Sequence, residues 1–357
     1  MDNRAINLGF SERYRQEASS YEGLFLARVI AQYKDLYKVA TIDGEIMAEI
    51  SGKLRYTADA LPDYPAVGDF VMIDRIDDQS GNAVIRHILT RKSMFTRRAA
   101  GTGQAVQIVA ANIDTVFICM GLSQDFNLRR LERYLSIAWD SGALPVIVLT
   151  KSDLCDDLPA KLAGVAETAI GVEVVVTSGL TENGYQQILK YVKPGQTIAF
   201  IGSSGVGKST LINRLLGETV IITGATGKED QGRHTTTVRQ LFLLPSGGAV
   251  IDTPGMRELG LENANLSRTF ADIDELAAEC RFNDCRHENE PGCAVRQAIE
   301  AGELTEERLL SYKKLQKEAK YEGLNSRQIE NEKISTMFAE FDGIKNARDY
   351  IKSKKKR

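Results

Sequence analysis

The sequence has few cysteines and no long apolar run. Its five cysteines, an odd number among 357 residues, disfavour a disulfide framework and favour a reducing compartment. The longest apolar runs are short, such as Leu144–Leu149, whereas a membrane span needs roughly 18 apolar residues. The first ten residues carry Asp2 and Arg4 and lack the apolar core of a secretory signal. These absences predict a cytoplasmic protein that does not enter a membrane.

Net charge is also small, but the charge is unevenly distributed. The net charge is −3, with 43% hydrophobic and 26% charged residues, which is ordinary for a globular protein and excludes a largely disordered chain. Residues 344–357 hold seven basic side chains and one acid, Asp349, so this tail carries +6. Such a tail suits a polyanion such as RNA, and the alternative is a purely solubilising role.

The length favours two or three domains, and the sequence pattern changes at about residues 92 and 265. The first region, residues 1–92, contains short runs rich in β-branched and aromatic residues, separated by turn signals such as Asp43-Gly44. These runs are residues 23–30, 37–42, 45–50, 69–73 and 83–89. They predict a small antiparallel barrel, with an OB-fold as the leading candidate, although periodicity alone leaves a sandwich open.

The second region, residues 93–265, alternates apolar strands with helices. One helix is expected to be capped by Asn127 and to end before Gly142. The strands are expected at residues 115–120, 145–149, 172–176, 197–201 and 249–251. Continuous apolar strands between helices are typical of a mostly parallel sheet that helices cover on both faces. The third region, residues 266–343, is expected to be helical, and residues 344–357 form the basic tail.

A glycine-rich segment follows the strand at 197–201 and precedes a helix. It matches the pattern G-x-x-x-x-G-K-[ST] at every fixed position. Its residues are Gly202, Ser203, Ser204, Gly205, Val206, Gly207, Lys208, Ser209 and Thr210. In such a loop the backbone N–H groups point at phosphates, Lys208 reaches the β- and γ-phosphates, and Ser209 binds Mg²⁺. We therefore predict that this phosphate loop binds a nucleoside triphosphate.

A second motif, Asp252-Thr-Pro-Gly255, follows the strand at 249–251. Asp252 can hold the Mg²⁺ shell, and the Gly255 amide can meet the γ-phosphate. Taken alone, Asp-x-Pro-Gly is more often an ordinary turn. In combination with the phosphate loop it predicts a magnesium site.

The segment after the strand at 145–149 resembles the base-reading motif [NT]-K-x-D of GTPases. Its residues are Thr150, Lys151, Ser152 and Asp153. A carboxylate accepts hydrogen bonds from guanine N1–H and the 2-amino group together, whereas adenine offers neither donor. We expect Asp153 to select guanine and the Lys151 stem to pack over the base. Thr177 and Ser178 follow the strand at 172–176 and can form a further loop that touches guanine, with a simple turn as the alternative.

Three cysteines and one histidine lie within 14 residues of the third region. They are Cys280, Cys285, His287 and Cys293. Zn²⁺ prefers four tetrahedral sulfur and nitrogen ligands, and Cys₃His is a standard structural set. The spacing is not a common zinc-finger spacing, and buried free cysteines are the alternative, but the polar loop around them favours a metal. Four ligands leave no open position, so the predicted zinc is structural.

The order of the motifs differs from that of ordinary GTPases, which place the phosphate loop first and the base-reading motif last. Here Thr150–Asp153 precedes the phosphate loop by about 50 residues. The sequence therefore resembles the circularly permuted GTPases. The barrel before and the Cys/His module after resemble the ribosome small subunit-dependent GTPase A (RsgA) family, from about residue 20 to 340. This resemblance implies a monomeric GTP hydrolase with Mg²⁺ and one zinc ion, stimulated by the small ribosomal subunit, contacting its rRNA and acting in its late maturation.

The resemblance also suggests the hydrolysis residues, which include Lys208 and Gly255. Met256 stands where many GTPases have a water-orienting glutamine. The segment 232–237 resembles the family's Gly-x-His-Thr-Thr-Thr segment, so His234 is the candidate for orienting the attacking water and Thr236, among three threonines, for ligating Mg²⁺. The alternatives are a P-loop ATPase or kinase, or a nucleotide-dependent RNA-binding module that does not act on the ribosome.

Overall fold

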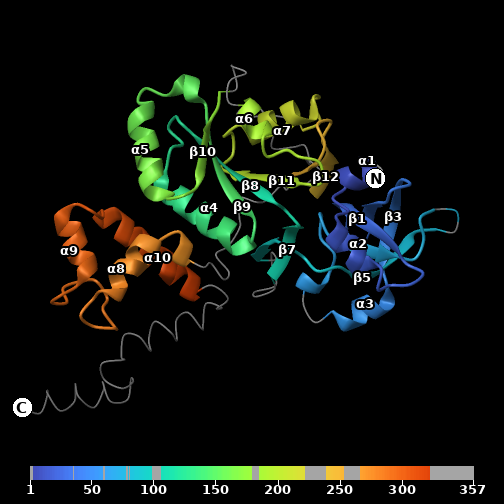
Figure 1. The fold of residues 1–357 in the computed structure, drawn as a ribbon, viewed down its shortest axis with the longest axis horizontal. Helices are drawn as coiled ribbons and strands as arrows, with labels where there is room; N and C mark the ends of the chain where they lie inside the picture. The colour runs from blue at the N-terminus through green and yellow to red at the C-terminus, as the bar shows by residue number, and fades with distance from the viewer. Residues whose placement is uncertain are drawn as a thin grey trace, which may run out of the picture.

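The computed structural model describes residues 3–34, 36–58, 61–77, 79, 81–98, 106–178, 185–221, 239–252 and 266–321. Three parts follow one another along its long axis: an N-terminal barrel, a central sheet flanked by helices and a C-terminal group of helices (Figure 1). No helix among the described residues is long and apolar enough to cross a membrane.

Five strands close the N-terminal barrel. They are β1 (Phe25–Gln32), β2 (Tyr37–Ala40), β3 (Glu45–Ile50), β4 (Phe70–Ile73) and β5 (Ala83–Ile88). The hydrogen-bonded order β1–β2–β3–β5–β4 returns to β1, because Phe25 of β1 pairs with Ile73 of β4. Alternate side chains point inward, and Val29, Val39 and Ile85 are fully buried there. The predicted barrel is therefore confirmed and its closure excludes the sandwich, but β3 and β5 pair in parallel, so the barrel is not wholly antiparallel.

Short helices pack around the barrel. They are α1 (Asn3–Asn7), α2 (Glu12–Ala18), α3 (Gly52–Thr57) and the 3₁₀ helix η1 (Leu61–Asp63). Tyr14 of α2 stacks on Phe70 of β4 with ring centroids 3.8 Å apart, and both side chains are buried. The N-terminal helices are thus part of the core, although the sequence pattern did not predict them.

The central sheet has five parallel strands and one antiparallel strand. They are β8 (Thr115–Gly121), β9 (Leu144–Thr150), β10 (Glu173–Val176), β11 (Thr197–Gly202), β13 (Ala249–Asp252) and the antiparallel β12 (Arg239–Leu243). The order across the sheet is β10–β9–β8–β11–β13–β12. The five parallel strands lie within one residue of their predicted bounds, so the predicted parallel sheet is confirmed.

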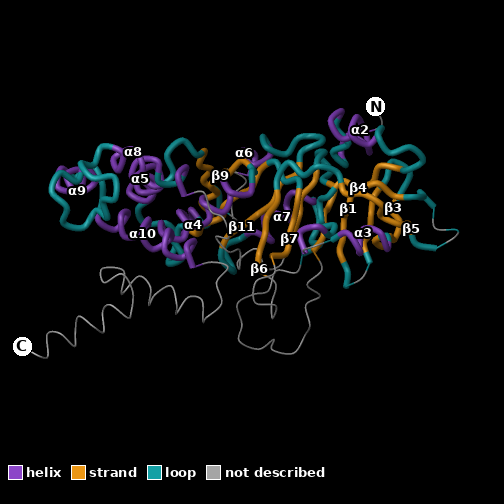
Figure 2. Tube along the Cα trace, turned by 90° about the horizontal axis from the view of Figure 1, so that it is seen from below, coloured by secondary structure: helices purple, strands orange, loops and turns teal. Residues whose placement is uncertain are grey.

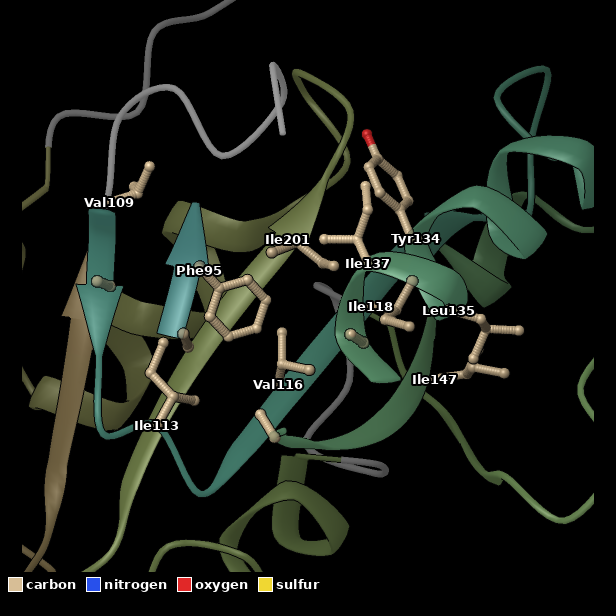
Figure 3. Close-up of a cluster of buried hydrophobic side chains, with 14 of the residues drawn as sticks. Phe95, Val109, Ile113, Val116, Ile118, Tyr134, Leu135, Ile137, Ile147 and Ile201 are labelled. Atoms are coloured by element: carbon tan, nitrogen blue, oxygen red, sulfur yellow. The ribbon is translucent and has the colours of Figure 1, made fainter. Parts of the chain in front are cut away.

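Helices cover both faces of this sheet. They are α4 (Leu128–Ser141) and α5 (Leu158–Thr168) on one face and α6 (Tyr185–Leu189) and α7 (Lys208–Leu216) on the other. Because side chains alternate along a strand, Ile118 and Ile201 face α4, whereas Phe117 and Phe200 face α6 and α7. Figure 3 shows Ile118 and Ile201 beside Ile137 of α4. Asn127 caps α4, and Gly142 ends it in a left-handed conformation, as predicted.

A separate hairpin links the barrel to the central sheet. Its strands are β6 (Met94–Arg98) and β7 (Val106–Ala111). Phe95 and Val109 of this hairpin are buried in the same core as Val116 of β8, as Figure 3 shows. The sequence analysis did not predict this hairpin.

The barrel and the central sheet also share backbone hydrogen bonds. β1 pairs antiparallel with β12, with Ala31 opposite Gln240, so eleven strands form one continuous sheet. Arg28 of β1 is buried at this junction and donates to the Thr197 hydroxyl at 2.6 Å and to the Leu8 carbonyl at 2.8 Å. The barrel is therefore fastened to the strand that leads into the phosphate loop.

The C-terminal helices pack at the opposite end, against α4 and α5 (Figure 2). They are the 3₁₀ helix η4 (Leu266–Arg268), α8 (Ala271–Ala278), α9 (Ala294–Ala301) and α10 (Glu306–Tyr321). The predicted helical character of this region is therefore confirmed, and Phe270, Ile273 and Leu309 are fully buried in its core. Glu132 of α4, also fully buried, pairs with Arg308 of α10 at 3.2 Å. The zinc-ligand candidates lie between α8 and α9.

Candidate functional site

The phosphate loop joins β11 to α7 at the carboxyl end of the parallel strands. Gly202 has φ +141°, and a Cβ at this position would lie 2.3 Å from the Cys119 carbonyl oxygen. Gly207, the N-cap of α7, has φ +107°. Since these conformations favour glycine, the loop can wrap closely between the strand and the helix N-terminus. This geometry suits the binding of phosphate groups.

The other residues of the loop differ in how far they are buried. Val206 is buried among the side chains that pack α7 on the sheet. Ser203 and Ser209 are half-buried, whereas Ser204, Gly205 and Thr210 are exposed. Ser209 and Thr210 lie in the first turn of α7. The hydroxyl expected to bind Mg²⁺ is therefore held on a helix rather than on the loop itself.

Two charged residues lie beside the glycine-rich turn: Lys208, the first residue of α7, and Asp252, the last residue of β13. Lys208 Nζ lies 2.7 Å from the Gly202 carbonyl oxygen and 2.6 Å from that of Ser203. Asp252 ends β13, which pairs with β11. Burial raises the pKa of Asp252, and the nearby positive charge of Lys208 partly opposes that shift. A cation, a hydroxyl and a carboxylate at one sheet edge fit a nucleotide with Mg²⁺.

The base-reading segment is fixed directly to the phosphate loop. The Thr150 hydroxyl is buried and donates to the Val206 carbonyl at 2.6 Å. Lys151 has φ +57°, a left-handed conformation, and leads into the 3₁₀ turn η2 (Ser152–Leu154). The chain reverses there and leaves Asp153 exposed at the sheet edge. The two motifs, separated by about 50 residues, thus belong to one site.

The segment after β10 supports this arrangement. The Ser178 hydroxyl donates to Asp153 Oδ1 at 2.5 Å, and the Ser152 N–H donates to the Thr177 carbonyl at 3.3 Å. Thr177 is buried, and its hydroxyl has no hydrogen-bond partner among the described residues. Ser178 orients the carboxylate of Asp153, a role that the sequence analysis did not assign to it.

The Cys/His cluster brings its four side chains together. Their ligand atoms all lie within 4.8 Å of one another. His287 Nδ1 lies 3.6 Å from Cys280 Sγ and 3.4 Å from Cys293 Sγ, and the two sulfur atoms are 3.9 Å apart. Tetrahedral zinc with bonds of about 2.3 Å to sulfur and 2.0 Å to nitrogen requires separations of about 3.5–3.8 Å. The three quoted separations match these values, and Cys285 lies within 4.8 Å of the other ligand atoms, so the cluster fits a zinc site with Cys285 as the fourth ligand.

The backbone around the cluster is built to hold these ligands. His287 has φ +54°, and its carbonyl accepts from Arg296 Nε at 3.0 Å and Lys313 Nζ at 3.3 Å. Cys293 is the N-cap of α9, and its sulfur accepts from the Arg296 N–H. Contacts from α9 and α10 thus hold the backbone at His287 and the sulfur of Cys293 in place.

Comparison with known proteins decides the family. The model of the RsgA GTPase family matches residues 88–262. Small ribosomal subunit biogenesis GTPase RsgA 2 of Lactiplantibacillus plantarum is 51% identical over 344 residues, which cover 96% of this chain and 97% of that protein. This chain belongs to the RsgA GTPase family.

Solved structures agree with this assignment. The crystal structure of YjeQ from Thermotoga maritima matches with a TM-score of 0.61 and 27% identity, over 83% of this chain and 98% of that one. YloQ, described as a circularly permuted GTPase, matches with a TM-score of 0.59 and 25% identity, over 84% of this chain and 96% of that one. The predicted family, fold class and circular permutation are therefore confirmed, and the protein is a GTPase.

Some of the candidate residues lie outside the described part of this RsgA family member. They are His234, Thr236, Gly255 and Met256. Their roles therefore stay predictions. Within the described part, the structure brings together the phosphate loop, the base-reading segment and Asp252 at one sheet edge.

The sequence analysis missed two charged residues at this edge. Asp125, between β8 and α4, accepts from the Ser203 hydroxyl, and Arg130 of α4 donates to Asp125 at 2.5 Å. Asn127 was recognised as a helix cap, but no motif marks its charged neighbours. Their proximity to the phosphate loop becomes visible only in the folded chain.

Proposed function

We propose that this GTPase acts in the biogenesis of the small ribosomal subunit. The observation that supports the nucleotide assignment is the buried hydrogen bond from Thr150 to Val206, because it holds residues 150–153 against the phosphate loop. The ribosomal role is supported by the Lactiplantibacillus plantarum relative, which is a small ribosomal subunit biogenesis GTPase. An ATPase is disfavoured, since adenine would leave the Asp153 carboxylate without a donor.

Each part of the site has a proposed share in binding GTP or GDP. Asp153 would accept from guanine, Lys151 would pack over the base, and Thr150, Ser152, Thr177 and Ser178 would shape this pocket. The phosphates would lie on residues 202–210. Mg²⁺, which supplies charge neutralisation at the β- and γ-phosphates, would be held by Ser209, Thr236 and Asp252.

For hydrolysis, Lys208 would neutralise charge on the phosphates, the Gly255 N–H would donate to the γ-phosphate, and His234 would orient the attacking water. We expect Lys208→Ala to weaken nucleotide binding. We expect His234→Ala to leave GDP affinity unchanged and to lower turnover by about 10²–10⁴-fold. Unchanged turnover in His234→Ala would remove this residue from the mechanism.

The barrel offers a surface for rRNA. Tyr56 of α3 is 90% exposed, and the same helix carries Lys53 and Arg55. Arg86 of β5 adds another half-exposed cation. Basic side chains bind phosphates, and an exposed aromatic ring can stack on an unpaired base. We therefore assign RNA contacts to this face of the barrel.

The Cys₃His cluster would hold one structural zinc ion through Cys280, Cys285, His287 and Cys293, with no position left for catalysis. The proposed domains are the barrel (1–92), the GTPase domain (93–265), the zinc module (266–343) and the basic tail (344–357), which lies outside the described residues. We propose that the protein works as a cytoplasmic monomer.

The test is GTP hydrolysis by the purified protein, measured with and without purified small ribosomal subunits. We expect the subunits to increase turnover and ATP to be neither bound nor hydrolysed. Large ribosomal subunits at the same concentration serve as the control. Equal turnover with and without small subunits would contradict the ribosomal role, and hydrolysis of ATP at the same rate would contradict the guanine assignment.

A further inference from the structure

A polar cluster contacts the phosphate loop on the side of α4, and none of the roles above uses it. Asp125 accepts a hydrogen bond from the Ser203 hydroxyl. Arg130 Nη1 donates to the other carboxylate oxygen of Asp125 at 2.5 Å and lies 3.2 Å from Ser203 Oγ. Two charged side chains from outside the loop therefore meet on a single loop residue.

The carboxylate in this cluster is charged at neutral pH. Burial raises the pKa of Asp125, but hydrogen bonds from Ser203 and Arg130, together with the charges of Arg130 and Lys151, lower it below its ordinary value. A hydrogen bond to a charged acceptor is roughly twice as strong as one between neutral groups. The contact between Asp125 and Ser203 is thus stronger than an ordinary hydroxyl contact.

The segment that carries Asp125 is itself fixed. Asn127 caps α4 by accepting from the Arg130 N–H at 3.0 Å. At the end of β8, a Cβ on Gly121 would lie 3.6 Å from Asp125 Cβ and 3.8 Å from Val206 Cγ2, so this segment packs closely against the phosphate loop. The start of α4 therefore provides a rigid support for the carboxylate.

Ser203 transmits this support to a residue of the nucleotide site. Its hydroxyl is held by Asp125, and its carbonyl oxygen lies 2.6 Å from Lys208 Nζ. A displacement of Ser203 would therefore move an acceptor of the lysine and the N–H groups that follow in the loop. A misplacement of about 1 Å can reduce a reaction rate on the order of 10²-fold.

We propose that Asp125 is a positioning residue for GTP hydrolysis, which acts on the phosphate loop through Ser203 and is held in place by Arg130. The inference rests on the proposed function of the loop. Asp125 does not contact the nucleotide; it fixes the conformation in which the loop receives the phosphates.

The test combines substitutions at both ends of this hydrogen bond. We expect Asp125→Ala and Ser203→Ala each to lower kcat/KM for GTP by about 10- to 100-fold and to speed the release of mant-GDP. The double variant should be no worse than either single variant, because both remove the same contact. Asp125→Asn keeps one acceptor oxygen but loses the charge, so its kcat/KM should lie between those of the wild type and Asp125→Ala, which a general loss of stability would not explain.

The control is Asp156→Ala, an exposed aspartate after β9 at the same edge of the sheet, which should match the wild type. Wild-type kcat/KM and mant-GDP release in Asp125→Ala would overturn the inference, as would fully additive losses in the double variant. If the wild-type protein neither binds mant-GDP nor hydrolyses GTP, the proposed function fails instead, so the two failures are distinguishable.

Discussion

The nucleotide site and the Cys₃His cluster are built in opposite ways. The nucleotide site lies at the ends of parallel strands, and hydrogen bonds within the protein fix it, such as Thr150 to Val206 and Ser178 to Asp153. The cluster lies in irregular chain between α8 and α9, where every residue from 281 to 292 is at least partly exposed. Buried strands support the first site on both faces, whereas in the second only Cys293 is fully buried and the loop before it is exposed.

This difference indicates what each ligand contributes to the fold. The parallel sheet buries its strands on both faces, so the nucleotide site should persist when no nucleotide is bound. None of residues 281–292 is fully buried, so zinc would act as the core of this loop. The predictions below separate these two kinds of site.

The largest expected effect is that of zinc removal. Structural zinc contributes about 10–16 kcal/mol of apparent binding free energy in zinc-finger peptides. We expect a zinc chelator to abolish hydrogen-exchange protection in residues 279–301 and to leave the central strands protected. Mass-spectrometric hydrogen exchange measures both regions at once. Loss of protection in β8 and β11 as well, or no loss anywhere, would contradict the view that zinc orders the cluster whereas the sheet orders itself.

The next effect concerns the ion pairs that fasten the C-terminal helices to α4. Arg308 pairs with the buried Glu132 and forms two hydrogen bonds with Asp272, at 2.7 and 2.9 Å. We expect Arg308→Met to lower the free energy of unfolding by about 1.5–3 kcal/mol, because Glu132 and Asp272 lose charged hydrogen bonds, although Arg129 still pairs with Glu132 at 2.5 Å. Urea denaturation measures this change.

The matched control for this prediction is the double variant Glu132→Gln with Arg308→Met, in which the buried side chain that has lost Arg308 carries no charge. It should be clearly more stable than Arg308→Met alone. A double variant that is less stable than the single one would show that packing, rather than the charge pair, fastens this interface.

The smallest effect is expected at the contact between the two nucleotide motifs. Thr150→Val removes one hydrogen bond, worth about 0.5–1.5 kcal/mol, and should weaken mant-GDP binding by roughly 2- to 10-fold without unfolding the sheet. Thr168→Val is the control, because its hydroxyl donates to the Gly164 carbonyl at 2.7 Å within α5. It should lose similar stability and keep wild-type nucleotide affinity. Equal mant-GDP affinities in Thr150→Val and Thr168→Val would show that the hydrogen bond from Thr150 to Val206 does not support nucleotide binding.

The sequence predicted those features whose chemistry demands particular residues at fixed spacing. The phosphate loop requires glycine where φ is positive, as at Gly202 and Gly207, and guanine selection requires a carboxylate such as Asp153. The parallel strands were predictable because strands buried on both faces are continuously apolar. Each of these features could be predicted from residues that are close together in the sequence.

The features that were not predicted depend on contacts between distant residues. The pairing of Ala31 with Gln240 joins segments about 200 residues apart, and β1 shows no local sign of it. In the sequence Asp125 and Arg130 look like ordinary polar residues, and only the folded chain shows that both contact Ser203. The role of Ser178 could not be predicted either, because it depends on a contact with Asp153, which lies 25 residues earlier in the chain.

The most direct test of the central claim, that this site reads guanine through Asp153, is to measure GTP and XTP binding by Asp153→Asn. An amide can donate to the 2-oxo group of xanthine, whereas guanine presents a donor there and would face the amide N–H₂. We expect the variant to lose affinity for GTP and to gain affinity for XTP, with the wild type showing the reverse preference. Wild-type GTP affinity in Asp153→Asn would contradict the assignment of the base-reading segment.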